Sequence, residues 1–121
     1  MARATPIPDS ARIAVETRDG GCVRCGAPGG NFHHRRSRSV RDALTHSPGN
    51  AVILCGSGTT LCHGWVHAHP AEARGSGWIV SRFIADPATE PVWTIRHGWV
   101  LLDHDGHFTL ARDTAGEDRH Q

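Results

Sequence analysis

The sequence contains no lysine, so all 13 of its basic side chains are arginines. It also has no long hydrophobic run, since its apolar stretches span only a few residues, as in 51–55, and this excludes a transmembrane helix. The first residues, Met-Ala-Arg-Ala-Thr-Pro, lack the apolar segment of a secretory signal. We therefore expect a cytoplasmic protein with no membrane partner, in a reducing compartment where cysteines bind metals more often than they form disulfides.

The chain is short and poor in apolar residues. Its 121 residues suffice for one small domain. Only 38% of them are hydrophobic, and 14 are glycine. A core this thin often needs a disulfide or a bound metal for stability, and the four cysteines and ten histidines could supply a metal site.

Positive charge is concentrated in the N-terminal part of the chain. Residues 1–45 contain eight arginines and four acidic residues, a net charge of +4, whereas residues 46–121 carry −3 and the whole chain +1. Four of the arginines fall within seven residues: Arg35, Arg36, Arg38 and Arg41. Guanidinium groups bind phosphate well, so this run is either a phosphate-binding surface or a solvated basic loop.

The helix and strand signals along the chain predict an α+β fold. We expect a helix over 10–18 and a helix over 63–74 that contains Pro70 or ends at it. The short runs that favour β structure are 31–36, 78–80, 92–95 and 99–102, and 51–54 is a short apolar segment that leads into Cys55. We expect a core over 1–76, a β-rich C-terminal extension of the same domain over 77–110, and a flexible tail over 111–121.

The four cysteines have the spacing of zinc ligands. Two residues separate Cys22 from Cys25, and six residues, including two glycines, separate Cys55 from Cys62. Two such pairs about thirty residues apart favour a structural zinc site with four thiolate ligands. Four unrelated thiols, or disulfides, are the weaker alternatives.

Four histidines have spacings that suit a second, open metal site. His33 and His34 are neighbours on an expected strand, so their side chains point to opposite faces. His63 and His67 are four residues apart on an expected helix, so they share a face. A strand imidazole and one or two helix imidazoles could bind one ion and leave positions open for water and phosphate. We expect surface positions for His97, His104, His107 and His120, and we assign no role to His46 or His69.

The order of these motifs resembles the HNH endonuclease family, in the branch that has a zinc knuckle beside the ββα-metal (His-Me finger) motif. The chain is most similar to the small HNH proteins encoded by phages of actinobacteria. The resemblance covers 18–70, and the segment 77–102 is also similar to those phage proteins. The motifs are Cys22-Val-Arg-Cys25, Phe32-His33-His34-Arg35-Arg36, Ser47-Pro-Gly-Asn50-Ala-Val-Ile-Leu-Cys55 and Leu61-Cys62-His63-Gly-Trp-Val-His67. One departure is the six residues between Cys55 and Cys62, where the family usually has two.

The resemblance implies a role for each matched residue. His34 corresponds to the general base that activates water, and Asn50 to the residue that ties the loop together and orients the base. His33 and His63 correspond to ligands of the catalytic ion, which could be Mg²⁺, Mn²⁺, Ni²⁺ or Zn²⁺. His67 is a third ligand or a phosphate contact. The four cysteines correspond to the structural zinc site.

We therefore expect a metal-dependent HNH endonuclease that hydrolyses phosphodiester bonds of DNA. The substrate is expected to be duplex DNA with weak sequence preference, because arginine contacts to phosphate carry little sequence information. The resemblance implies a phage protein in the cytoplasm of the bacterial host, with a role in genome packaging beside the terminase. The alternatives are a non-catalytic zinc-ribbon module that binds DNA and a terminase-associated assembly factor.

Overall fold

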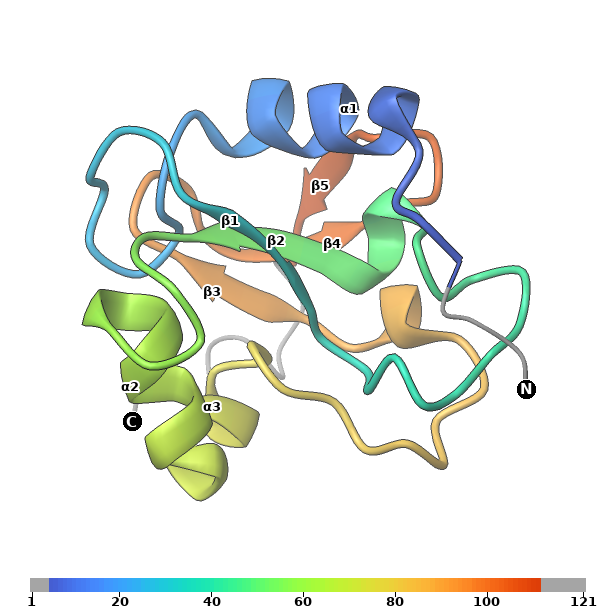
Figure 1. Ribbon diagram of the computed structural model, residues 1–121. Helices are drawn as coiled ribbons and strands as arrows, with labels where there is room; N and C mark the ends of the chain where they lie inside the picture. The colour runs from blue at the N-terminus through green and yellow to red at the C-terminus, as the bar shows by residue number, and fades with distance from the viewer. Residues whose placement is uncertain (1–4, 112–121) are drawn as a thin grey trace.

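The computed structural model describes residues 5–111. Within them the protein is a small domain of mixed helix and strand, as the sequence predicts, with three α-helices, two short 3-10 helices and five strands (Figure 1). None of the helices in this part of the chain is long and apolar enough to span a membrane. The elements in chain order are α1 (Asp9–Asp19), β1 (Asn31–His34), η1 (Pro48–Asn50), β2 (Ala51–Leu54), α2 (Leu61–Ala68), α3 (Pro70–Gly75), η2 (Pro87–Thr89), β3 (Val92–Thr94), β4 (Gly98–Leu102) and β5 (Phe108–Leu110).

Strand β2 is the centre of the domain. It pairs with β1 in an antiparallel ladder in which Asn31 lies opposite Leu54 and His34 opposite Ala51. All four residues of β2 are buried, because α1 covers one face while the thiols, α2 and the C-terminal sheet pack against the other. A strand buried on both faces reads as a continuous apolar run rather than an alternating one, which accounts for the sequence Ala-Val-Ile-Leu.

A buried ion pair within α1 connects this helix to β2 through hydrogen bonds. The Arg18 guanidinium donates to the Asp19 carboxylate (2.8 Å) and to the carbonyl oxygens of Pro48 and Ala51 (2.8 and 2.6 Å). The same carboxylate accepts from the backbone N–H of Ile53 (2.8 Å). These contacts fix the C-terminal end of α1 beside β2, the strand that leads into Cys55.

The expected helix over 63–74 is two helices. Helix α2 ends at Ala68, and Pro70 begins α3. Proline has no N–H and suits the first turn of a helix, where no intrahelical partner is needed. The break turns the chain, so α3 lies beside α2 as a second short segment (Figure 1).

The β-rich region after Gly77 forms a three-stranded antiparallel sheet in the order β3-β4-β5. The runs over 92–95 and 99–102 are strands as predicted, although β3 ends at Thr94 and β4 begins at Gly98. The prediction of a strand over 78–80 is wrong, because this segment forms only an isolated bridge between Arg36 and Val80. β5 was not predicted. Of the expected tail over 111–121, residues 112–121 lie outside the described part of the chain.

Candidate functional site

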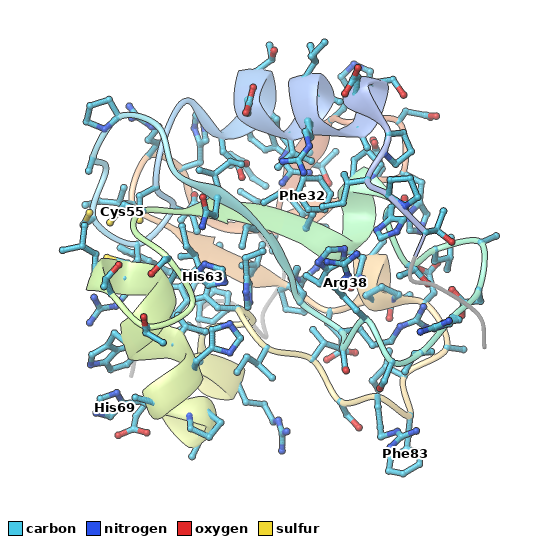
Figure 2. All side chains as sticks on the ribbon, viewed as in Figure 1. Phe32, Arg38, Cys55, His63, His69 and Phe83 are labelled. Atoms are coloured by element: carbon cyan, nitrogen blue, oxygen red, sulfur yellow. The ribbon has the colours of Figure 1, made fainter. Side chains whose placement is uncertain are left out.

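The four cysteine thiols meet at one point. Their sulfur atoms all lie within 4.8 Å of one another, and those of Cys25 and Cys55 are 3.7 Å apart. A tetrahedral zinc site with Zn–S bonds of about 2.3 Å requires sulfur–sulfur separations of about 3.8 Å. The cluster therefore has the ligand type, number and spacing of a structural zinc site, at the left of Figure 2 where Cys55 is labelled.

The insert between the second pair of cysteines does not prevent this convergence. Its Ser57 and Thr60 form a closed turn, in which the Thr60 N–H donates to the Ser57 carbonyl oxygen (3.1 Å). Gly56 begins the turn at φ +86°, and a Cβ there would lie 2.4 Å from the Thr60 carbonyl oxygen. The His63 N–H then donates to the Cys55 carbonyl oxygen (2.9 Å), which places Cys62 back beside Cys55.

The environment of the thiols favours a bound cation. Burial raises the pKa of both Cys55 and Cys62. Burial would also raise the pKa of Cys22, but hydrogen bonds from backbone N–H groups lower it to about 7. The Arg24 guanidinium donates to the Cys62 sulfur (3.4 Å) and lies 3.9 Å from the centre of the Trp65 ring. Four crowded thiols cannot ionise together without positive charge, and a bound metal ion would supply most of it.

Three imidazoles, from β1 and α2, form a second cluster. One ring nitrogen from each of His33, His63 and His67 lies within 4.8 Å of the other two. The ring centres are 4.8–5.5 Å apart. His33 belongs to β1, and the other two residues to one face of α2. No carboxylate belongs to this group of donors in the described residues.

The hydrogen bonds of the cluster leave lone pairs free for a ligand. Nε2 of His33 donates to the carbonyl oxygen of Trp78 (2.7 Å), so the nitrogen that His33 can offer is the unprotonated Nδ1. Burial, and after it the nearby His63 and His67, lowers the pKa of His33 to about 3. Nδ1 of His63 is buried and has no hydrogen-bond partner among the described residues. A neutral, oriented His33 and an unpartnered buried His63 nitrogen fit a metal ion, because a buried nitrogen without a partner is otherwise costly.

His34 lies beside this cluster and has different partners. It is half-buried, and its Nε2 is 2.9 Å from Nδ1 of His46. Burial, followed by the charges of Arg38, His46 and Arg12, lowers the pKa of His34 to about 4. The imidazole is therefore neutral at physiological pH, as an acceptor of a proton must be.

A groove of about 630 Å³ opens over both kinds of histidine. His33, His34, His63 and His67 line it, together with basic side chains from three separate segments of the chain. Those with exposed side chains are Arg38, Arg74 and Arg82. Arg38 and His63 are both labelled in Figure 2, with His63 beside α2. Arg74 and Arg82 were not predicted as site residues, because each is an isolated arginine far from the basic run.

The expectation that Arg35 and Arg36 bind phosphate is corrected by their burial, since each is only 1% exposed. Arg35 borders the groove, but all five of its N–H donors point to backbone carbonyl oxygens. These belong to Gly77 (2.8 Å), Gly49 (3.2 Å), Pro87 (3.1 Å), Glu90 (2.6 Å) and Pro91 (3.5 Å). The guanidinium of Arg35 is thus part of the interior and is not available to a nucleic acid.

Arg36 is held in a similar way. Its guanidinium donates to the carbonyl oxygens of Ile84 and Ala85 (3.0 and 2.9 Å) and to the carboxylate of Asp42 (2.7 Å). Of the predicted basic run, only Arg38 and Arg41 are exposed, and Arg41 does not line the groove.

Asn50 is fully buried and lies outside the groove. Its side-chain oxygen accepts from the Arg36 N–H (2.8 Å), while its amide nitrogen donates to the carbonyl oxygens of Thr45 (2.9 Å) and Arg36 (3.3 Å). Asn50 therefore joins the two ends of the loop between β1 and η1. It can position the residues of the site but cannot contact a ligand in the groove.

The remaining histidines divide by burial. His97 and His107 are exposed, as expected for surface residues. His104 is not a plain surface residue: its two nitrogens contact Ser47 and Asp86, the residues that cap η1 and η2. His120 lies outside the described residues. These serine–histidine–aspartate contacts therefore link η1 to η2.

Comparisons with known proteins gave no match: no family model, no curated protein and no solved structure matches the chain.

Proposed function

We propose that this protein is a metal-dependent endonuclease of the HNH type, which hydrolyses phosphodiester bonds of DNA. The observation that carries the proposal is the grouping of three metal-competent imidazoles with a fourth, neutral imidazole in one groove bordered by exposed arginines. A metal-binding histidine cluster alone suits many functions. Its combination with a separate base and with phosphate-binding side chains suits phosphodiester hydrolysis.

The arrangement of the elements supports the finer assignment to a ββα-metal unit. β1 carries His33 and His34, Asn50 immediately precedes β2, and α2 carries His63 and His67. The thiol cluster joins the loop before β1 to Cys55, just after β2, and to Cys62, in the first turn of α2. In this proposal a structural zinc ion at the four cysteines fixes the position of α2 relative to the hairpin.

His33, His63 and His67 would hold the catalytic ion, which when bound would polarise the scissile phosphate and stabilise charge on the leaving oxygen. Three imidazoles without a carboxylate favour Zn²⁺ or Ni²⁺ over Mg²⁺, because Mg²⁺ prefers oxygen ligands. This preference narrows the choice that the sequence leaves open.

The other residues of the groove have roles that follow from their chemistry. His34 would take the proton from an attacking water molecule, since it is neutral and lies in the groove without belonging to the three-imidazole cluster. Arg38, Arg74 and Arg82 would bind phosphates on either side of the scissile bond. These contacts do not read bases, so weak sequence preference is expected.

A plasmid-nicking assay tests the proposal. The protein is loaded with zinc at the thiols, freed of weakly held metal, and supplied with Mg²⁺, Mn²⁺, Ni²⁺ or Zn²⁺ in turn. We expect relaxation of supercoiled DNA that depends on the added metal and is lost in His34→Ala. His107→Ala is the matched control, because His107 is exposed and lies outside the groove.

The failed outcomes are informative. DNA binding without cleavage under any metal would favour the non-catalytic DNA-binding module. Cleavage that appears only beside terminase would favour the assembly factor. Cleavage that persists unchanged in His34→Ala would remove His34 from the role of base.

A further inference from the structure

A second histidine contacts the proposed base from outside the metal cluster. His46 lies in the loop between β1 and η1, twelve residues after His34. Its Nδ1 is 2.9 Å from Nε2 of His34, and the two ring centres are 5.1 Å apart. On its other side, Nε2 of His46 is 2.7 Å from the carbonyl oxygen of Thr5.

When both rings are neutral, the hydrogens of these two hydrogen bonds can be placed in only one way. The carbonyl oxygen of Thr5 can only accept, so Nε2 of His46 carries the hydrogen and its Nδ1 has the lone pair. That lone pair accepts from His34, so Nε2 of His34 carries a hydrogen as well. Nδ1 of His34 is then the nitrogen with a free lone pair, and within residues 5–111 it has no hydrogen-bond partner.

The backbone holds the two histidines at this distance. The side chain of Asn50 bonds the N–H and carbonyl oxygen of Arg36, two residues after His34, and the carbonyl oxygen of Thr45, immediately before His46. Asn50 thus links the segment that carries one imidazole to the segment that carries the other. The hydroxyl of Thr45 also donates to the carbonyl oxygen of Val40 (2.7 Å), which closes the loop.

We propose that His46 is a positioning residue, which orients His34 and holds it in the tautomer whose Nδ1 accepts the proton of the attacking water. This inference rests on the proposed function for its catalytic consequence, but the tautomer of His34 can be measured without it. A base that loses its orienting partner spends part of its time in the wrong tautomer. General-base catalysis contributes about 10²-fold to 10⁴-fold, so a partial loss of the correct tautomer costs at most a factor of that size.

Two variants of His46 distinguish loss of the hydrogen bond to His34 from loss of side-chain volume. His46→Leu fills similar space but accepts no hydrogen bond. His46→Asn keeps an acceptor oxygen near the position of Nδ1. His107→Leu is the control for loss of an exposed histidine elsewhere.

The experiment is nitrogen NMR of the histidine rings in the zinc-loaded full chain, with His34 assigned by its absence in His34→Gln. We expect the Nε2–H tautomer of His34 in the wild type, a mixture in His46→Leu, and recovery in His46→Asn. The nicking rate should fall about 10²-fold in His46→Leu and recover in part in His46→Asn, with unchanged affinity for DNA.

Several results would overturn the inference. One is a wild-type His34 with the hydrogen on Nδ1. Another is a His46→Leu variant that keeps both the tautomer and the nicking rate. If His46→Leu does not fold, the wild type and His46→Asn decide the question. If the wild type never cleaves DNA, the proposed function fails, and the ring spectra still show whether His46 orients His34.

Discussion

Replacing the buried Arg35 should destabilise the protein without removing a DNA contact. In Arg35→Met the side chain keeps much of its apolar length but loses all five N–H donors. The carbonyl oxygens that they bond, in Gly49, Gly77, Pro87, Glu90 and Pro91, lose these partners. At 1% exposure, the site admits little water to replace the guanidinium.

The size of the effect can be worked from the hydrogen bonds. Three of them are 3.1 Å or shorter, to Gly77, Pro87 and Glu90. At about 1 kcal/mol each, their loss costs about 3 kcal/mol. The unpaired carbonyl oxygens add to this cost, while relief from burying a charge offsets part of it. Burial already lowers the pKa of Arg35 to about 10, which leaves the group charged at neutral pH. We expect a net loss of about 2–4 kcal/mol in the free energy of unfolding, and a melting temperature lower by about 10 °C.

The assay is urea unfolding of the zinc-loaded protein, followed by tryptophan fluorescence, together with DNA binding at several salt concentrations. Arg38→Met is the matched control, because Arg38 is exposed and lines the groove. Its free energy of unfolding should change by less than about 0.5 kcal/mol. The slope of the logarithm of its DNA-binding constant against the logarithm of salt concentration should become shallower by about 0.9. Arg35→Met should show the opposite pattern at a temperature where it is folded.

One result would refute this reasoning. If Arg35→Met keeps the stability of the wild type and loses affinity for DNA as Arg38→Met does, its guanidinium faces the ligand and not the interior.

Three further predictions concern the metals and the acid stability. Cys25→Ser removes one of four thiolates, so a chelator that leaves the wild type intact should strip zinc from the variant and lower its melting temperature. His67→Ala should weaken Co²⁺ binding at the imidazoles by about 10-fold or more, seen in visible absorption after the thiol site is filled with zinc. Burial acts to raise the pKa of Asp86, but hydrogen bonds from His104 and the Ala88 N–H hold it below its usual value. A lowered carboxyl pKa contributes stability that is present above the unfolded pKa and is lost as pH falls through the folded value. The stability difference between wild type and Asp86→Asn should therefore shrink below about pH 4, and equal slopes across that range in urea titrations would contradict the prediction.

Local patterns account for what the sequence predicted well. The spacing of Cys22 and Cys25 defines a knuckle within one turn, and the run over 51–54 is a short apolar segment that leads into Cys55. These features depend on neighbours in the chain, so single-sequence patterns contain them. The break at Pro70 is also local, because the missing N–H and fixed φ of proline act at its own position.

The features that could not be predicted from the sequence depend on segments that come together only in the folded protein. The adjacent pair Arg35 and Arg36 looks like a basic surface, because nothing near it in the chain indicates carbonyl oxygens from 49 and from 77–91. His46 had no assigned role for the same reason, since its partner lies across a folded loop. A pattern of residue types records charge and spacing, whereas burial of a charge requires a set of acceptors that only tertiary structure brings together.

The segment His33-His34-Arg35-Arg36 supplies imidazoles to the groove and also holds in place the chain segment 77–91, which forms a wall of the groove. The imidazoles face the groove, while the guanidinium groups reach inward and bond the chain between 77 and 91. That chain includes Arg82 and the Trp78 carbonyl oxygen that orients His33. Moving the wall away from the imidazoles would break several charge-assisted hydrogen bonds in a buried setting, each stronger than a neutral bond. The arginines proposed to bind phosphate and the imidazole proposed as the base are thus held at a fixed separation before any ligand arrives, which is the condition for stabilising charge that develops during a reaction.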